Sequence, residues 1–116
     1  MTDRAALLDY ADELLDGAFG LGASGPRTAA LLARCALEDW LDEQSADWCH
    51  AVSGYGPTTN SKLVVLGTRQ GVEFGERAMQ LWQALSRAVH HHAYELQPSV
   101  AEVKHLVGRV RALSVA

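Results

Sequence analysis

Apolar residues recur every three or four positions along most of this chain, which is the spacing of one face of an α-helix. Alternation typical of a β-strand never extends beyond a few residues. The sequence therefore predicts an all-α fold, an antiparallel up-and-down bundle of four to five helices joined by short loops. The apolar stripes begin with Leu7, Leu8, Ala11, Leu14 and Leu15 and continue over residues 30–48, 63–67, 78–89 and 103–113.

Capping and helix-breaking residues set the expected ends of the first two helices. Thr2 is an acceptable N-cap, and Asp3 would then lie in the first turn, where the helix dipole favours an anion. Glycines between residues 17 and 22 end this helix. The chain restarts at Ser24-Gly25-Pro26, because proline is tolerated in the first helical turn. We expect the second helix to run to about residue 50, where its helical period stops.

A glycine pair leaves two routes open through the middle of the chain. The third helix should be capped within Thr58–Asn60. Gly71 and Gly75 could lie inside one long helix at a close-packed contact, each costing up to about 1 kcal/mol relative to alanine. Alternatively the chain bends there and begins a further helix, which is the route we favour. Ser99 and Glu102 then form a capping box that opens the last helix.

Length and composition exclude several classes of protein. The 116 residues fit one domain, 1–116, and their 48% apolar content is too high for a disordered chain. No apolar run reaches the roughly 18 residues of a membrane span, and the acidic, amphipathic first residues resemble neither a secretory nor a transit signal. We therefore expect a cytoplasmic protein with no membrane partner. Cys35 and Cys49 are then expected to be buried, free thiols.

The net charge of −4 is divided unevenly along the chain. Residues 1–50 carry a balance of −7, and residues 51–116 carry a balance of +3. This asymmetry could give one face a positive field in spite of the acidic total. It is too small for a general nucleic-acid-binding domain, which would be strongly basic. Any contact with a polyanion must be local.

One segment concentrates groups that could do chemistry, namely Arg87-Ala-Val-His90-His91-His92-Ala-Tyr94 near the end of a predicted helix. Histidine changes charge near neutral pH, so histidines beside an arginine form a plausible proton-transfer site. A purely structural interpretation also stands, because cations at a helix C-terminus complement its dipole by up to about 1 kcal/mol.

A metal site built from the three consecutive histidines, with His105 or Glu95 added, is a weaker interpretation. Adjacent residues on a helix diverge by about 100°, so three consecutive histidines cannot converge on one ion. The paired Glu-x-x-His motifs of di-metal bundles are absent as well. We expect neither a bound metal nor a cofactor.

The spacing Arg87-x4-His92 resembles the Arg-x4–6-His signature of the HEPN (higher eukaryotes and prokaryotes nucleotide-binding) helical superfamily. The longer string from Trp82 to Pro98, with SRAVHHHAYEL at its centre, is similar to a small HEPN-like branch of actinobacterial type. The resemblance covers about residues 29–110 of the chain. It implies a bundle of four or five helices, frequent homodimers, and often a metal-independent ribonuclease of a toxin or defence system. Active members usually carry a polar residue after the arginine, where Ala88 stands here.

The residue types suit the chemistry that this resemblance implies. Cleaving RNA without a metal needs a base for the 2′-hydroxyl proton, an acid for the leaving oxygen and a cation for the phosphate. In this hypothesis Arg87 binds phosphate and His92 transfers protons, with His90 and His91 as alternates and Tyr94 orienting the substrate. A homodimer would bring two such sets together. The alternative is a non-catalytic helical module that binds a second copy or another protein through its apolar faces.

Overall fold

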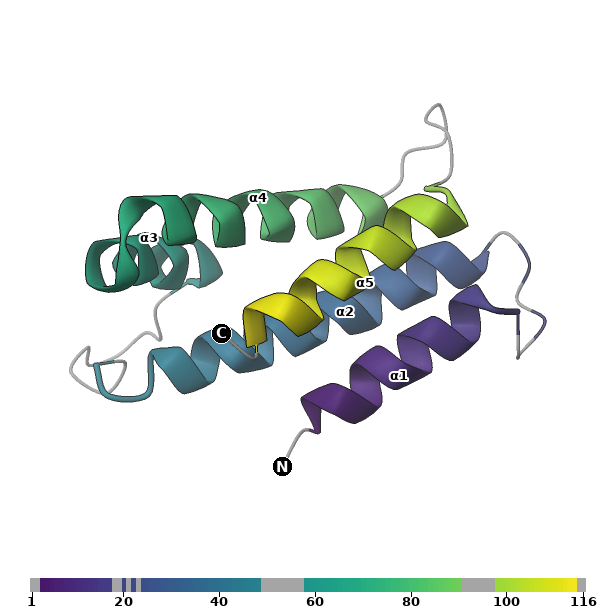
Figure 1. The fold of residues 1–116 in the computed structure, drawn as a ribbon, viewed down its shortest axis with the longest axis horizontal. Coiled ribbons are helices and arrows are strands. Elements are labelled where there is room, and N and C mark those ends of the chain that lie inside the picture. The colour runs from purple at the N-terminus through teal and green to yellow at the C-terminus, as the bar shows by residue number, and fades with distance from the viewer. Residues whose placement is uncertain are drawn as a thin grey trace.

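The computed structural model describes residues 3–17, 20, 22, 24–48, 58–90 and 98–114. Within these ranges the chain forms five helices and no strand, so the predicted all-α bundle is confirmed. In Figure 1, α1 and α4 run from left to right, whereas α2 and α5 run in the opposite direction. The helices are α1 (Arg4–Leu15), α2 (Ser24–Gln44), α3 (Thr59–Gln70), α4 (Val72–Val89) and α5 (Val100–Ser114).

Helix α2 is the centre of the bundle and contacts each of the other four helices. Four of its buried positions are alanines, and small side chains let neighbouring helices approach closely. At its first turn a Cβ atom on Gly25 would lie only 3.2 Å from the carbonyl oxygen of Leu14 in α1. The core around α2 is filled mainly by leucine and valine, and its largest fully buried side chains are Leu8, Leu37, Leu41, Leu63, Leu81, Leu85, Val103, Val107 and Val110.

The observed ends of the first two helices correct two predictions. Asp3 caps α1, since its carboxylate accepts a hydrogen bond of 3.2 Å from the amide of Ala6, so the cap predicted at Thr2 is wrong by one residue. Aspartate is as good an N-cap as serine or asparagine, and it outranks threonine. Helix α2 ends at Gln44 and not near residue 50. Beyond it the amide of Ser45 is shared between the carbonyls of Leu41 and Asp42, which tightens the chain into turns.

The predicted caps of α3 and α5 are confirmed. The hydroxyl of Thr58 accepts a hydrogen bond of 3.1 Å from the amide of Ser61, and the hydroxyl of Ser99 accepts one of 3.0 Å from the amide of Glu102. Each of these bonds satisfies an amide that has no partner inside its helix. The two helices therefore begin where their sequences predict.

The chain bends at Gly71, as favoured, whereas Gly75 lies inside α4 at a close contact. Gly71 has φ of 109°, a conformation that side-chain-bearing residues rarely adopt, and it separates α3 from α4. A Cβ atom on Gly75 would stand 2.4 Å from the Cα of Gly67. The absence of a side chain at Gly75 is thus what lets α3 and α4 cross at this point.

Ion pairs between helices account for much of the uneven charge along the sequence. Arg111 of α5 binds Asp9 and Asp12 of α1 at 2.8 and 2.7 Å, and Lys104 binds Asp16 at 2.9 Å. On α3, Lys62 pairs with Asp42 of α2, and Arg69 pairs with Asp47 in the turn after α2. Cations from the second half of the chain thereby neutralise acids from the first half. No helix in the described part of the chain is long and apolar enough to cross a membrane.

Candidate anion-binding site at the end of α4

The structure places two of the predicted site residues at the C-terminal end of α4. Arg87 lies in the last turn and is exposed, and His90 directly follows the helix as its C-cap. The amide of His90 donates a hydrogen bond of 2.9 Å to the carbonyl of Ser86. His91, His92 and Tyr94 lie outside the residues that the structure describes.

The helical period explains why Arg87 is exposed at this end. The buried side of α4 contains Ala78, Leu81, Leu85 and Ala88, and Arg87 lies outside that stripe. A cation in the last turn also complements the partial negative charge of the helix C-terminus. Arg87 therefore has a local reason to be an arginine, and its guanidinium remains open to solvent.

An arginine from α2 contacts the first of the three histidines. Nη1 of Arg34 lies 3.2 Å from Nε2 of His90. A guanidinium has only donors, so Nε2 is the acceptor in this contact. The contact therefore occupies Nε2 of His90.

A second arginine from α2 binds the backbone at the same place. Nε of Arg27 donates a hydrogen bond of 2.8 Å to the carbonyl of Val89, one of the last carbonyls of α4 that has no partner within the helix. Neither Arg27 nor Arg34 was predicted from the sequence as a residue of the site. Their separation of seven residues, about two helical turns, was the available signal, because it places them on one face of the second helix.

Arg34 is itself held in place by two further groups. Its Cζ lies 5.4 Å from the centre of the Trp82 ring, within the range of a cation–π contact. Its Nε also binds Glu38 at 3.2 Å, one turn further along α2. On α4, Nε1 of Trp82 and Oγ of Ser86 are buried without a hydrogen-bond partner.

Arg27 and Arg34 contact Val89 and His90 at the end of α4, and Arg87 lies in the same last turn; we call Arg27, Arg34, Arg87 and His90 the basic cluster. Glu38 is the only acid that pairs with any of these four among the described residues. The side chain of Arg87 makes no ion pair or hydrogen bond with any other residue in the described ranges. In a chain of net charge −4, the cluster is a local concentration of positive charge.

Two arginines of the cluster retain unused hydrogen-bond donors. Arg27 uses only Nε and Arg34 uses Nε and Nη1, so each retains guanidinium N–H groups for a ligand. Arginine donors suit phosphate oxygens, because two parallel N–H groups match their geometry. Within the described part of the chain, no three His, Cys, Asp or Glu side chains are grouped to hold a metal ion.

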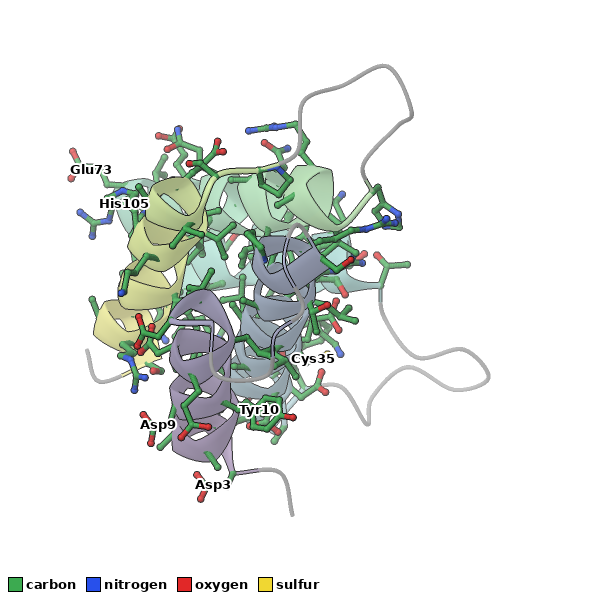
Figure 2. All side chains as sticks on the ribbon, turned by 90° about the vertical axis from the view of Figure 1, so that its right-hand side faces the viewer. Asp3, Asp9, Tyr10, Cys35, Glu73 and His105 are labelled. Carbon is green, nitrogen blue, oxygen red and sulfur yellow. The ribbon has the colours of Figure 1, made fainter. Side chains whose placement is uncertain are left out.

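Other residues singled out in the sequence lie away from the cluster. Cys35 is a free thiol that is exposed on α2, so its predicted burial is wrong (Figure 2). Its neighbours Arg34 and Ala36 point toward α4 and the core, which leaves position 35 on the outer side of the helix. Cys49 lies outside the described residues. His105 is exposed on α5 (Figure 2).

Comparisons with known proteins find no match for this chain. No protein-family model, no curated protein and no solved structure matches the chain.

Proposed function

We propose that this protein engages RNA or a nucleotide through the basic cluster, with Arg87 binding phosphate. The supporting observation is that Arg87, unlike four of the seven cations in residues 51–116, has no acid partner among the described residues, and that of the three unpaired ones (Arg77, Arg87 and Arg109) it is the one at the end of α4. Lys62, Arg69, Lys104 and Arg111 are each paired with an acid. Arg87 is exposed and has no such partner among the described residues. A guanidinium in that state is available to an incoming phosphate.

A cytoplasmic, HEPN-like, metal-independent ribonuclease activity is part of this proposal. His92 is the proton-transfer group, His91 is its alternate and Tyr94 orients the substrate. His90 has a supporting role, because Arg34 occupies its Nε2. Two copies in a homodimer would supply both the base that removes the 2′-hydroxyl proton and the acid that protonates the leaving 5′-oxygen.

The binding test compares two single substitutions of unpaired arginines. A fluorescein-labelled single-stranded RNA is titrated with wild type, Arg87→Ala and Arg109→Ala, and anisotropy is recorded at several salt concentrations. Arg109 is the matched control, because it lies on α5 and is not ion-paired with any described residue. We expect Arg87→Ala to weaken binding about five- to tenfold and to reduce the salt slope by about one. Equal losses in the two variants, or no binding by wild type at low salt, would overturn the proposal.

The cleavage test uses the same RNA in the presence of a chelator. We expect slow cleavage by wild type that chelator does not inhibit, and loss of cleavage in His92→Ala with RNA binding retained. Binding without cleavage would restrict the protein to a non-catalytic role in RNA or nucleotide binding. Cleavage that persists in His92→Ala would assign the proton transfer to a different residue.

A further inference from the structure

An apolar groove runs along the outer side of the α3–α4 hairpin, at the end of α4 opposite the basic cluster. The groove has a volume of about 600 Å³. Leu63 and Val64 of α3 and Val72 and Met79 of α4 supply its apolar lining. Both valines are unusually exposed to solvent for apolar side chains, since the exposed fraction is 57% for Val64 and 70% for Val72.

The groove exists because its floor contains glycine and its outer side has no neighbouring helix. Gly67 and Gly75 meet at the crossing of α3 and α4, so no side chain fills the space above them. Among the described helices α3 contacts only α2 and α4, and α1 and α5 lie on the other side of the bundle (Figure 1). The groove is therefore a concave, apolar surface that this chain leaves uncovered in its described part.

The charge beside the groove is negative. Among the described residues Glu76 is the only charged one in the lining, and Glu73 projects into solvent one turn earlier on α4 (Figure 2). Neither carboxylate forms an ion pair with a described residue. The nearby cations are directed elsewhere. On α3, Lys62 binds Asp42 of α2 and Arg69 binds Asp47 in the turn after α2. On α4, Arg77 lies outside the lining and stacks over the ring of Phe74.

We propose that this groove binds an amphipathic helix of another protein, one with an apolar stripe and with lysine or arginine along one edge. Helices bind in apolar grooves through side chains spaced at i, i+3, i+4 and i+7. The apolar stripe would cover Val64 and Val72, and the basic edge would lie against Glu73 and Glu76. Helix α3 has 12 residues, a length of about 18 Å, so a partner of three to four turns would span it.

Charge argues against a second copy of this chain as the occupant. Two grooves facing each other would bring their acidic edges into one interface, and the unpaired groove residues supply no cation to offset them. Like charges brought together in an interface oppose association and discriminate against the wrong partner. A partner helix with a basic edge has no such conflict.

The test uses synthetic helical peptides as probes. One peptide of roughly 14 residues carries leucines at i, i+3, i+4 and i+7 spacing with lysines along one edge. A second peptide has glutamates in place of those lysines, and a third has serines in place of the leucines. Binding is measured by isothermal titration calorimetry with the whole chain. We expect the lysine peptide to bind at least about tenfold more tightly than either of the others.

Substitutions in the groove then locate the binding site. Val72→Asn should weaken the lysine peptide about tenfold or more, and Glu76→Lys should reverse the preference between lysine and glutamate peptides. Val100→Asn is the control, because Val100 is also an exposed valine but lies at the start of α5. Circular dichroism checks that each variant retains its helical content. Arg87→Ala should leave peptide binding unchanged, which separates this proposal from the proposed RNA site.

Several results would overturn the proposal. These are no binding of the lysine peptide, equal binding of the lysine and glutamate peptides, or a lysine-peptide affinity that Val72→Asn does not change. Sedimentation of the chain without peptide provides the remaining test. A concentration-dependent dimer that Val72→Asn dissociates would assign the groove to a second copy instead.

Discussion

The two ends of α4 present opposite chemistry, although the same buried stripe runs between them. At the C-terminal end Arg27 and Arg34 of α2 contact Val89 and His90, Arg87 is exposed in the same turn, and arginines predominate. At the N-terminal end Val72 and Glu76 line the groove together with α3, and this lining is apolar with one carboxylate. The neighbouring helix makes the difference, since α2 contributes arginines at one end and α3 contributes glycine and valine at the other.

This contrast separates positions that hold the fold from positions that remain available for binding. Leu81 and Leu85 in the middle of α4 are buried against the core. Val72 and Arg87 near its two ends are exposed. Substitutions in the buried stripe should therefore change stability, and substitutions at the ends should change ligand binding with little effect on stability.

A truncation in the middle of α4 should have the largest effect. Leu85 is fully buried, so Leu85→Ala should lower the free energy of unfolding by about 2–5 kcal/mol through lost apolar burial and the cavity that remains. Val72→Ala removes carbons that are mostly exposed and should change it by less than about 0.5 kcal/mol. Urea denaturation followed by circular dichroism measures both. Similar losses in the two variants would contradict the division between core and ends.

The crossing of α3 and α4 predicts an asymmetry between two glycines. Gly75→Ala places a Cβ atom 2.4 Å from the Cα of Gly67, so the helices must separate, and we expect a loss of about 1–3 kcal/mol. In Gly67→Ala the new Cβ atom meets the Cα of Gly75 at 3.6 Å, an ordinary contact. That variant should be neutral or more stable by up to about 1 kcal/mol, because alanine favours a helix. Thermal unfolding of both variants decides between these outcomes, and an equal response to the two changes would argue against this crossing.

Substitutions of two serines should change stability by smaller amounts and in opposite directions. Oγ of Ser86 is buried without a partner, so Ser86→Ala should raise stability by about 1 kcal/mol through relief of desolvation. Oγ of Ser99 caps α5, so Ser99→Ala should lower stability by about 1 kcal/mol. Denaturation midpoints of the two variants should therefore shift in opposite directions. A loss of stability in Ser86→Ala would show that its hydroxyl has a partner.

The smallest effect concerns the ion pair between Arg69 of α3 and Asp47 in the turn after α2, and its dependence on pH. The hydrogen bond from Arg69 lowers the pKa of Asp47 below its usual value of 3.8. The stability that this pair contributes is present above that usual value and is lost as the pH falls through the lowered pKa in the folded protein. An NMR titration of the Asp47 carboxyl should show its pKa rising toward 3.8 in Arg69→Met. No change in that pKa would mean that the ion pair does not form in solution.

The helical architecture could be predicted from local signals, and so could most helix starts. The caps at Thr58 and Ser99 and the bend at Gly71 depend on residues within one helical turn. The wrong predictions arose where two neighbouring residues could both cap a helix, or where the burial of a residue depended on the orientation of its helix in the bundle. Asp3 and Thr2 were both acceptable caps, and the burial of Cys35 depended on which side of α2 faces the bundle.

The candidate site was predictable only in part. Arg87 and His90 are close in sequence, so one helix end brings them together. Arg27 and Arg34 are separated from that end by 62 and 56 residues, and no spacing rule connects them to it. His91, His92 and Tyr94, which belong to the predicted site, lie outside the described residues, and their roles stay a prediction.

Sequence alone determined that this chain is helical, because periodicity and capping act over a few residues and need no knowledge of the partner helices. It also determined that an arginine and three histidines stand at the end of the apolar stripe of α4. Packing of α2 against α4 then decided which cations share a surface, and packing of α3 against α2 decided which ones are neutralised. The crossing at Gly67 and Gly75 likewise opened the groove. These outcomes depend on distances between residues far apart in the chain, which only the assembled bundle defines.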